Sequence, residues 1–171
     1  MRYRIALALA MPLIANAAEP EWIAAFGRGA DAADTDIVRL GYRYPLKENG
    51  KWWMPSHAQL GASVWRVPDI AGTTRRLDLS VSGIWRTERP WGYAEAGFGP
   101  YLLSKTIHND DTSMPSSLEF GSHLGVGLRL AKNQTLGIGI QHLSNAGIKQ
   151  PNGGINLLLL QYTVSTGTPN R

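Results

Sequence analysis

The chain of 171 residues contains no cysteine, which excludes disulfide scaffolds, thiolate zinc sites and cysteine nucleophiles. It also lacks any run of Lys or Arg, because the 17 basic residues stand singly or in pairs among 13 acidic ones. Nucleic-acid-binding proteins gather positive charge in a patch or motif, so the formal net charge of +4 does not indicate a nucleic-acid partner. A hydrophobic content of 43% with six Trp excludes a disordered chain.

Long apolar runs are scarce. The longest, Ile5 to Ala15, follows two arginines and leads into Ala15-Asn16-Ala17, which has small residues at the positions that a signal peptidase reads. The run is too short to cross a bilayer as a helix. We therefore expect a cleavable signal peptide at residues 1–17 and one domain at residues 18–171, a length sufficient for a full core.

Amphipathic helical spacing is also scarce, and apolar residues recur with a period of two. In Phe120 to Leu130, the even positions are mostly apolar, whereas the odd positions are Gly, His or Arg. Similar alternation predicts eight strands, near residues 21–29, 35–46, 57–66, 75–87, 91–102, 117–130, 134–144 and 154–164.

Two architectures use such strands. A soluble sandwich or lipocalin buries the apolar face, whereas a membrane barrel turns that face toward lipid. Many of the 19 glycines fall on the polar face, where the narrow bore of an eight-stranded barrel leaves little room for side chains. We therefore predict an all-β fold, an eight-stranded antiparallel transmembrane β-barrel of the bacterial outer membrane. Aromatic residues near strand ends suit an interfacial girdle, although ordinary core aromatics are the alternative: Tyr42, Tyr44, Trp85 and Tyr162.

The lengths of the connections predict the orientation of the barrel, because outer-membrane barrels have short periplasmic turns and longer external loops. Residues 87–90 and 131–134 are expected to be short turns, and both termini then lie in the periplasm. Long external loops are expected at 66–74, 103–116 and 145–153, with Met114-Pro115 dipping into the membrane interface; the long periplasmic segment 47–56 is an exception.

Charged residues on the predicted lumen face are expected to form an internal paired network rather than to line a channel: Arg39, Arg43, Asp78, Arg86, Glu95 and His123. The His108-Asn109-Asp110-Asp111 stretch has no recognised metal-ligand spacing, so we interpret it as a solvated loop. No cofactor motif is present, and we expect neither a cofactor nor a metal.

Two polar residues, His142 and Ser144, continue the lipid-facing stripe of one predicted strand at its external end. Asn156 shares the lipid-facing side of the next strand, so the three side chains are expected to meet on the outer wall. Because polar groups that face lipid are costly, this cluster indicates a function.

The stretch from His142 to Asn152, HLSNAGIKQPN, followed by Gly154-Ile155-Asn156, resembles the signature of the PagL family of outer-membrane lipid A 3-O-deacylases. The resemblance implies an esterase that removes the acyl chain ester-linked at the 3-position of lipid A. It assigns His142 as the base and Ser144 as the nucleophile of a serine triad on the barrel exterior.

The third member of the triad departs from the family, in which a Glu commonly occupies the position of Asn156. An asparagine oxygen can still accept the imidazole Nδ1 hydrogen, but it lacks the charge that stabilises an imidazolium. A decayed triad is therefore the alternative to an active one. On sequence alone, Asn156→Glu is expected to equal or exceed the parent in activity.

Ester cleavage also needs hydrogen-bond donors for the developing oxyanion. The candidates are the Asn145 and Asn152 side chains and the Gly147 backbone N–H, although turns use the same residue types. Asn145 has the lumen-facing parity, which counts against it. Lys149 is a candidate for contacting the anionic headgroup, with a solvated surface lysine as the alternative.

The expected partners are lipopolysaccharide, as the lipid A substrate, and outer-membrane lipids. The oligomeric state is open, and a homodimer is compatible with the sequence. A non-enzymatic small barrel, acting as an adhesin or a structural protein, is the alternative function. It accounts for the signal and the inverted alternation but not for the polar cluster.

Overall fold

The computed structural model describes residues 19–31, 34–46, 51–69, 72–108, 113–150 and 152–166. The expected signal peptide and most of the His108–Asp111 stretch lie outside these residues. No helix in the described ranges is long and apolar enough to cross a membrane. The strands are β1 (Glu21–Gly29), β2 (Asp36–Pro45), β3 (His57–Asp69), β4 (Gly72–Arg89), β5 (Gly92–Leu103), β6 (Ile107–His108), β7 (Ser113–Met114), β8 (Leu118–Ala131), β9 (Gln134–Ser144) and β10 (Ile155–Ser165).

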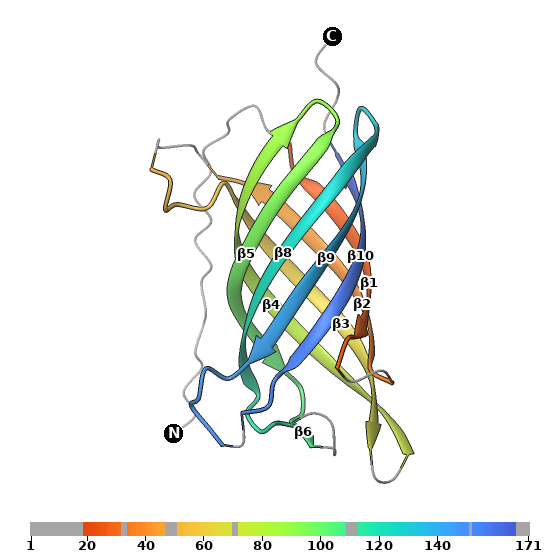
Figure 1. Ribbon diagram of the computed structural model, residues 1–171, viewed down its shortest axis with the longest axis vertical. Coiled ribbons are helices and arrows are strands. Elements are labelled where there is room, and N and C mark those ends of the chain that lie inside the picture. Colours follow the sequence, from red (N-terminus) through yellow and green to blue (C-terminus); the bar gives the residue numbers. More distant parts are fainter. Residues whose placement is uncertain are drawn as a thin grey trace, which may run out of the picture.

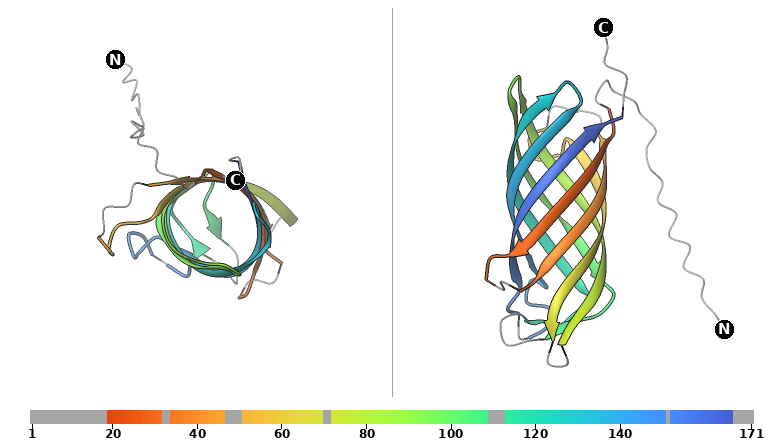
Figure 2. Two further views of the ribbon diagram at one scale, coloured as in Figure 1. Left: turned by 90° about the horizontal axis from the view of Figure 1, so that it is seen from above. Right: turned by 90° about the vertical axis from the view of Figure 1, so that its right-hand side faces the viewer.

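Eight of these strands close into a barrel in the order β1-β10-β9-β8-β5-β4-β3-β2, and β6 and β7 form a separate two-stranded sheet. Each barrel strand pairs antiparallel with its neighbours, and β1 closes the barrel against β10. The strands tilt around a single cylinder, with the start of β1 and the end of β10 at the same rim (Figures 1 and 2). The predicted fold class is confirmed, and the strand bounds agree closely except between β3 and β4.

The outer wall is apolar. On β9, Leu136, Ile138 and Ile140 are 40%, 64% and 56% exposed, whereas their neighbour Gln141 is 2% exposed. A soluble protein would bury such a stripe, so this pattern is the inverted alternation of a barrel that faces lipid. The alternation predicted for β8, β9 and β10 is therefore confirmed.

The lumen is filled with paired charges. Arg43 Nη1 lies 3.2 Å from Glu21 Oε2 and 3.0 Å from Glu95 Oε2. Arg86 Nη1 lies 3.0 Å from the same Glu21 oxygen, and His123 Nε2 lies 3.5 Å from Glu95 Oε1. The predicted internal network is confirmed in this half of the barrel, with Glu21 as an added member.

Glycine makes room for the larger lumenal side chains. A Cβ on Gly127 or Gly137 would overlap the ring or hydroxyl of Tyr93, and one on Gly121 would overlap the ring of Tyr101. Arg86 in turn stacks on Tyr93, with its guanidinium carbon 3.8 Å from the ring centroid. The glycine-rich polar face therefore follows from the narrow bore, as the sequence predicts.

The rim opposite the termini is closed by an apolar cluster. Met114 is fully buried there, so the expectation that it dips into the membrane interface is wrong. Strands β6 and β7 lie at the barrel opening (Figure 2), and Met114 of β7 is stabilised there by apolar burial. The cluster comprises Ile37, Trp65, Val67, Tyr101, Leu103, Met114, Leu143, Ile155, Leu157 and Leu159.

The predicted long loop at residues 66–74 is also wrong. Strands β3 and β4 continue through it as a paired hairpin that projects past the rim (Figure 1), with Asp69 opposite Gly72. Trp65 and Val67 are 0% and 2% exposed because they pack into the apolar cluster. This packing extends the ladder through Arg66 and Pro68, which resemble loop residues in the sequence.

Candidate active site on the outer wall

Strands β9 and β10 bring together the three residues that the sequence analysis singled out. Asn156 pairs directly with His142, and Ser144 pairs with Phe120 of β8. His142 and Asn156 are exposed and Ser144 is half-buried, whereas the intervening Leu143 is fully buried. All three polar side chains therefore have the outward parity, at the rim opposite the termini.

His142 and Asn156 are joined by a hydrogen bond, with 2.9 Å between His142 Nδ1 and Asn156 Oδ1. Directly opposite residues in an antiparallel pair hold their side chains close together, which positions this contact. The bond leaves the other ring nitrogen of His142, Nε2, for a second partner.

His142 and Ser144 both lie close to Gly154. A Cβ added to Gly154 would lie 3.0 Å from His142 Cε1 and 3.1 Å from Ser144 Cβ. Its φ of 64° and the Leu143 carbonyl oxygen, 2.6 Å from such a Cβ, both favour glycine here. Within the described residues Ser144 Oγ makes no hydrogen bond to His142. Catalytic hydrogen bonds in ligand-free structures are often long and shorten when substrate binds.

Asp31 is a member of the cluster that the sequence analysis missed. Its Oδ2 accepts a hydrogen bond of 2.6 Å from Asn156 Nδ2, and its Oδ1 accepts one of 3.1 Å from the Asn156 backbone N–H. Ala30 N–H donates to the Asn156 carbonyl at 2.8 Å. Barrel closure could have indicated Asp31 from the sequence, because pairing of the first and last strands places the end of β1 beside the start of β10.

The loop between β9 and β10 is organised by its own asparagines. Asn145 is fully buried, and its Oδ1 accepts the Gly147 N–H at 2.9 Å while its Nδ2 donates to the Lys149 carbonyl at 2.8 Å. Asn152 Oδ1 accepts the Asn145 N–H at 3.1 Å. The Asn145 side chain and the Gly147 N–H are thus engaged within the loop, whereas Asn152 Nδ2 has no hydrogen bond to a described residue. The Lys149 side chain is exposed.

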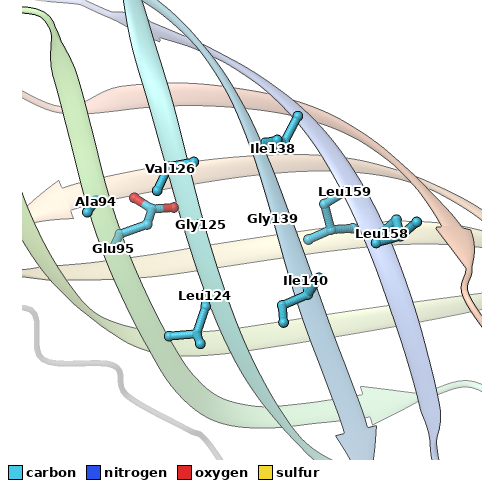
Figure 3. A pocket seen from close by; sticks show the side chains of 10 residues that line it. All are labelled: Ala94, Glu95, Leu124, Gly125, Val126, Ile138, Gly139, Ile140, Leu158 and Leu159. Carbon is cyan, nitrogen blue, oxygen red and sulfur yellow. The ribbon is translucent and has the colours of Figure 1, made fainter.

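An apolar groove runs along the outer wall from the polar cluster. A first depression contains His142 and Asn156 together with Leu124, Ile140 and Leu158. These three apolar residues are shared with a second depression, which continues away from the site over Ala94, Leu124, Val126, Ile138, Ile140 and Leu158 (Figure 3). The small outward-facing side chains of Ala94 and Ala96 on β5 leave room between the larger apolar side chains of this stretch of wall.

Metal ligands are not gathered at this site or elsewhere in the described ranges. No group of three or more His, Asp or Glu side chains there is arranged to hold a metal ion. His123 faces Glu95 in the lumen rather than the outer cluster. The outer-wall cluster itself presents a serine hydroxyl, an imidazole, an amide and a carboxylate.

A transmembrane barrel with these groups on its lipid-facing wall is an integral membrane protein with a candidate hydrolytic site on its outer surface. The family model described as "Lipid A 3-O-deacylase (PagL)" matches residues 36–165, and the chain belongs to this family. It is therefore an outer-membrane β-barrel enzyme that hydrolyses an ester bond.

Two similar proteins carry the name lipid A deacylase PagL. One, from Bordetella bronchiseptica, is 40% identical over 134 residues, which covers 74% of each chain. The other, from Pseudomonas aeruginosa, is 30% identical over 167 residues, which covers 92% of each chain.

One solved structure supports the same relationship, and another shares only the fold. The crystal structure of the outer membrane enzyme PagL superposes with a TM-score of 0.67 and 27% identity, covering 85% of this chain and 99% of that one. Neisserial surface protein A, at a TM-score of 0.52 and 12% identity, covers 86% of this chain and 94% of its own and shares the fold alone.

Proposed function

We propose that this protein hydrolyses the ester-linked acyl chain at the 3-position of lipid A in the outer leaflet. The observation that carries the proposal is the His142–Asn156 hydrogen bond on the lipid-facing wall, beside Ser144 and at the end of an apolar groove. A lipid embedded in the membrane reaches this wall without leaving the bilayer, whereas it does not reach the charged lumen.

Ser144 is the nucleophile and His142 is the general base. Ser144 Oγ attacks the ester carbonyl carbon while His142 Nε2 takes the hydroxyl proton, and Asn156 Oδ1 holds the Nδ1 hydrogen. The carbon–oxygen bond to the sugar then breaks, and the sugar hydroxyl leaves with the proton from His142. Water, activated by the same imidazole, hydrolyses the acyl-enzyme and releases the fatty acid.

The oxyanion donors come from the loop that follows Ser144. Of the three candidates, Asn152 has an amide nitrogen without a described partner and contacts the residue next to Ser144, so we assign it the donor role. Asn145 and Gly147 position this loop through the hydrogen bonds within it. Donors held in place before substrate arrives stabilise the tetrahedral intermediate most effectively.

The groove and the barrel rim contact different parts of the substrate. The acyl chain lies along the groove over Leu124, Ile140 and Leu158. The exposed Lys149, in the loop beside Ser144, contacts the anionic headgroup at the membrane surface.

We further propose that residues 1–17 are removed during export, leaving residues 18–171 as the barrel. Intact-mass measurement of protein purified from outer membranes tests the cleavage site directly. A retained N-terminal segment would contradict it.

Mass spectrometry of lipid A from cells that express the protein tests the activity. The expected result is loss of one 3-hydroxyacyl mass, with fragmentation that assigns the loss to the 3-position. Ser144→Ala is the matched control and is expected to leave lipid A intact. Unchanged lipid A in cells with a folded wild-type barrel would favour the non-enzymatic alternative.

A further inference from the structure

Asp31 reaches the candidate site from the opposite end of the chain. It follows β1 and lies 125 positions before Asn156 in the sequence. Both of its carboxylate oxygens engage that one residue, at 2.6 Å to the side-chain Nδ2 and 3.1 Å to the backbone N–H. Asn156 in turn contacts His142 at 2.9 Å. The three side chains therefore form a continuous chain of hydrogen bonds that ends at the imidazole.

The carboxylate determines which way the amide points. An ionised carboxylate only accepts hydrogen bonds, so the Asn156 atom that faces Asp31 has to be the donor, Nδ2. The amide oxygen then faces His142, and an oxygen there requires the hydrogen on Nδ1. Nε2 is left unprotonated, which is the form that can accept a proton from a serine hydroxyl.

The carboxylate also supplies negative charge. An imidazolium forms when His142 takes a proton, and a neutral amide alone stabilises it less than a carboxylate does. Because hydrogen bonds in a chain polarise one another, a carboxylate bonded to the amide nitrogen makes the amide oxygen a stronger acceptor. The negative charge that Asn156 lacks is thus provided by Asp31, which is hydrogen-bonded to the far side of the Asn156 amide.

We propose that Asp31 is a positioning residue for His142, acting through Asn156 by orienting its amide and by supplying the charge that the amide lacks. The proposal rests on the proposed function, since it assigns His142 as the base. A purely structural role makes a different prediction, because a tie between the β1–β2 connection and β10 needs only the bond to the Asn156 backbone.

A double-mutant cycle separates the two roles. Asp31→Ala is made in the wild-type chain and in Asn156→Glu, and the activity of the folded barrel is measured in detergent with lipid A. The labelling rate of Ser144 by a fluorophosphonate probe is measured in parallel, since it reports the nucleophile independently of the lipid substrate. Asp34→Ala is the matched control, because Asp34 is an exposed acid in the same connection.

In the wild-type chain, we expect Asp31→Ala to lower both rates by about 10- to 100-fold, by analogy with the loss of partners that orient metal-ligating histidines. Asp31→Asn is expected to lose less, and Asp34→Ala to leave both rates unchanged. In the Asn156→Glu background, Asp31→Ala is expected to be neutral or to raise both rates, because Asp31 then faces a carboxylate instead of an amide nitrogen. An equal loss in both backgrounds, or a loss below twofold in the wild-type chain, would overturn the proposal.

The tautomer of His142 gives a readout that needs no activity. Nitrogen NMR of the histidine-labelled barrel is expected to show the hydrogen on Nδ1 in the wild-type chain and a mixture of tautomers in Asp31→Ala. An unchanged tautomer would overturn the orienting role. Labelling of Ser144 with lipid A left intact would contradict the proposed substrate instead, and the labelling and tautomer measurements would still decide the role of Asp31.

Discussion

The barrel has two polar clusters, one in the lumen and one on the outer wall, that differ in how many of their polar groups already have partners. In the lumen, Arg43 and Glu95 are almost completely buried and each has several partners of opposite charge. On the outer wall, His142 has one partner through Nδ1 and its side chain is exposed. The lumenal charges are paired with one another, whereas the outer cluster leaves a ring nitrogen and a hydroxyl for the proposed substrate.

The difference shows how one strand pattern separates stability from chemistry. Buried charges require partners, so the lumenal residues stabilise the fold only when they satisfy one another. The outer cluster lies where the membrane favours apolar side chains, so its polar residues carry an energetic cost. The proposed function accounts for their presence despite that cost. Substitutions in the first cluster should therefore affect unfolding, and those in the second should affect turnover.

The largest expected effect tests that separation at the outer wall. Ser144→Ala and His142→Ala are each expected to lower turnover by at least about 10³-fold, because the nucleophile and its base act as a unit. Neither side chain contributes to the lumenal network, so the urea midpoint of unfolding should stay at the wild-type value. Near wild-type turnover in either variant would exclude the triad assignment.

The converse prediction concerns the lumen. Glu95→Ala leaves Arg43 with Glu21 as its remaining carboxylate partner, and is expected to lower the free energy of unfolding by about 3–5 kcal/mol. Urea unfolding followed by Trp fluorescence measures the loss. Glu88→Ala is the comparison variant, because Glu88 is half exposed and Arg86 keeps Glu21 as a partner, so a smaller loss is expected. A large loss of turnover per folded molecule in Glu95→Ala would contradict the assignment of stability to the lumenal cluster and of catalysis to the outer one.

Most of this fold could be predicted from the sequence because the alternation of apolar and polar residues identifies the strands and their two faces. Most of the barrel strands have an apolar outward face and an inward face rich in Gly or polar residues, and the antiparallel closure then pairs neighbours. The exception is the closed rim, where inward residues such as Leu157 and Leu159 of β10 are apolar. The hairpin beyond Trp65 was missed because Arg66 and Pro68 are typical of loops. The burial that accompanies the longer strands comes from an apolar cluster whose other members, such as Met114, lie far along the chain.

The site was predicted in part for the same reason. His142, Ser144 and Asn156 share one parity on consecutive strands, so local pairing brings them together. Asp31 lies in a connection without periodicity, and no pattern near Asn156 indicates it. Only the closing pair β1–β10 relates the two, and that pair depends on the register of the whole barrel.

Asn156→Glu sharpens the comparison, because the structure changes what the sequence leads us to expect. A glutamate at this position places a second carboxylate beside Asp31, whose Oδ2 now accepts from the Asn156 amide at 2.6 Å. Like charges at this distance repel, so we expect kcat/KM to fall several-fold below wild type instead of rising. Asn156→Ala, which offers no acceptor to Nδ1, is the comparison variant and should be lower still. A rate at or above wild type for Asn156→Glu would mean that Asp31 leaves the site when a carboxylate replaces the amide.

The smallest expected effect lies at the rim of the outer cluster. Lys149 is exposed and bonds within the loop through its backbone, so its ammonium is available to an anionic headgroup. Such a contact at a membrane surface is worth about 1 kcal/mol, or roughly fivefold in apparent KM. Lys149→Gln should therefore raise KM with kcat unchanged, because the contact is made equally in the ground and transition states. Lys132→Gln, an exposed lysine at the opposite rim, is the matched control and should change neither constant. A fall in kcat alone for Lys149→Gln would place the ammonium at the reacting ester and extend the outer cluster by one charged member.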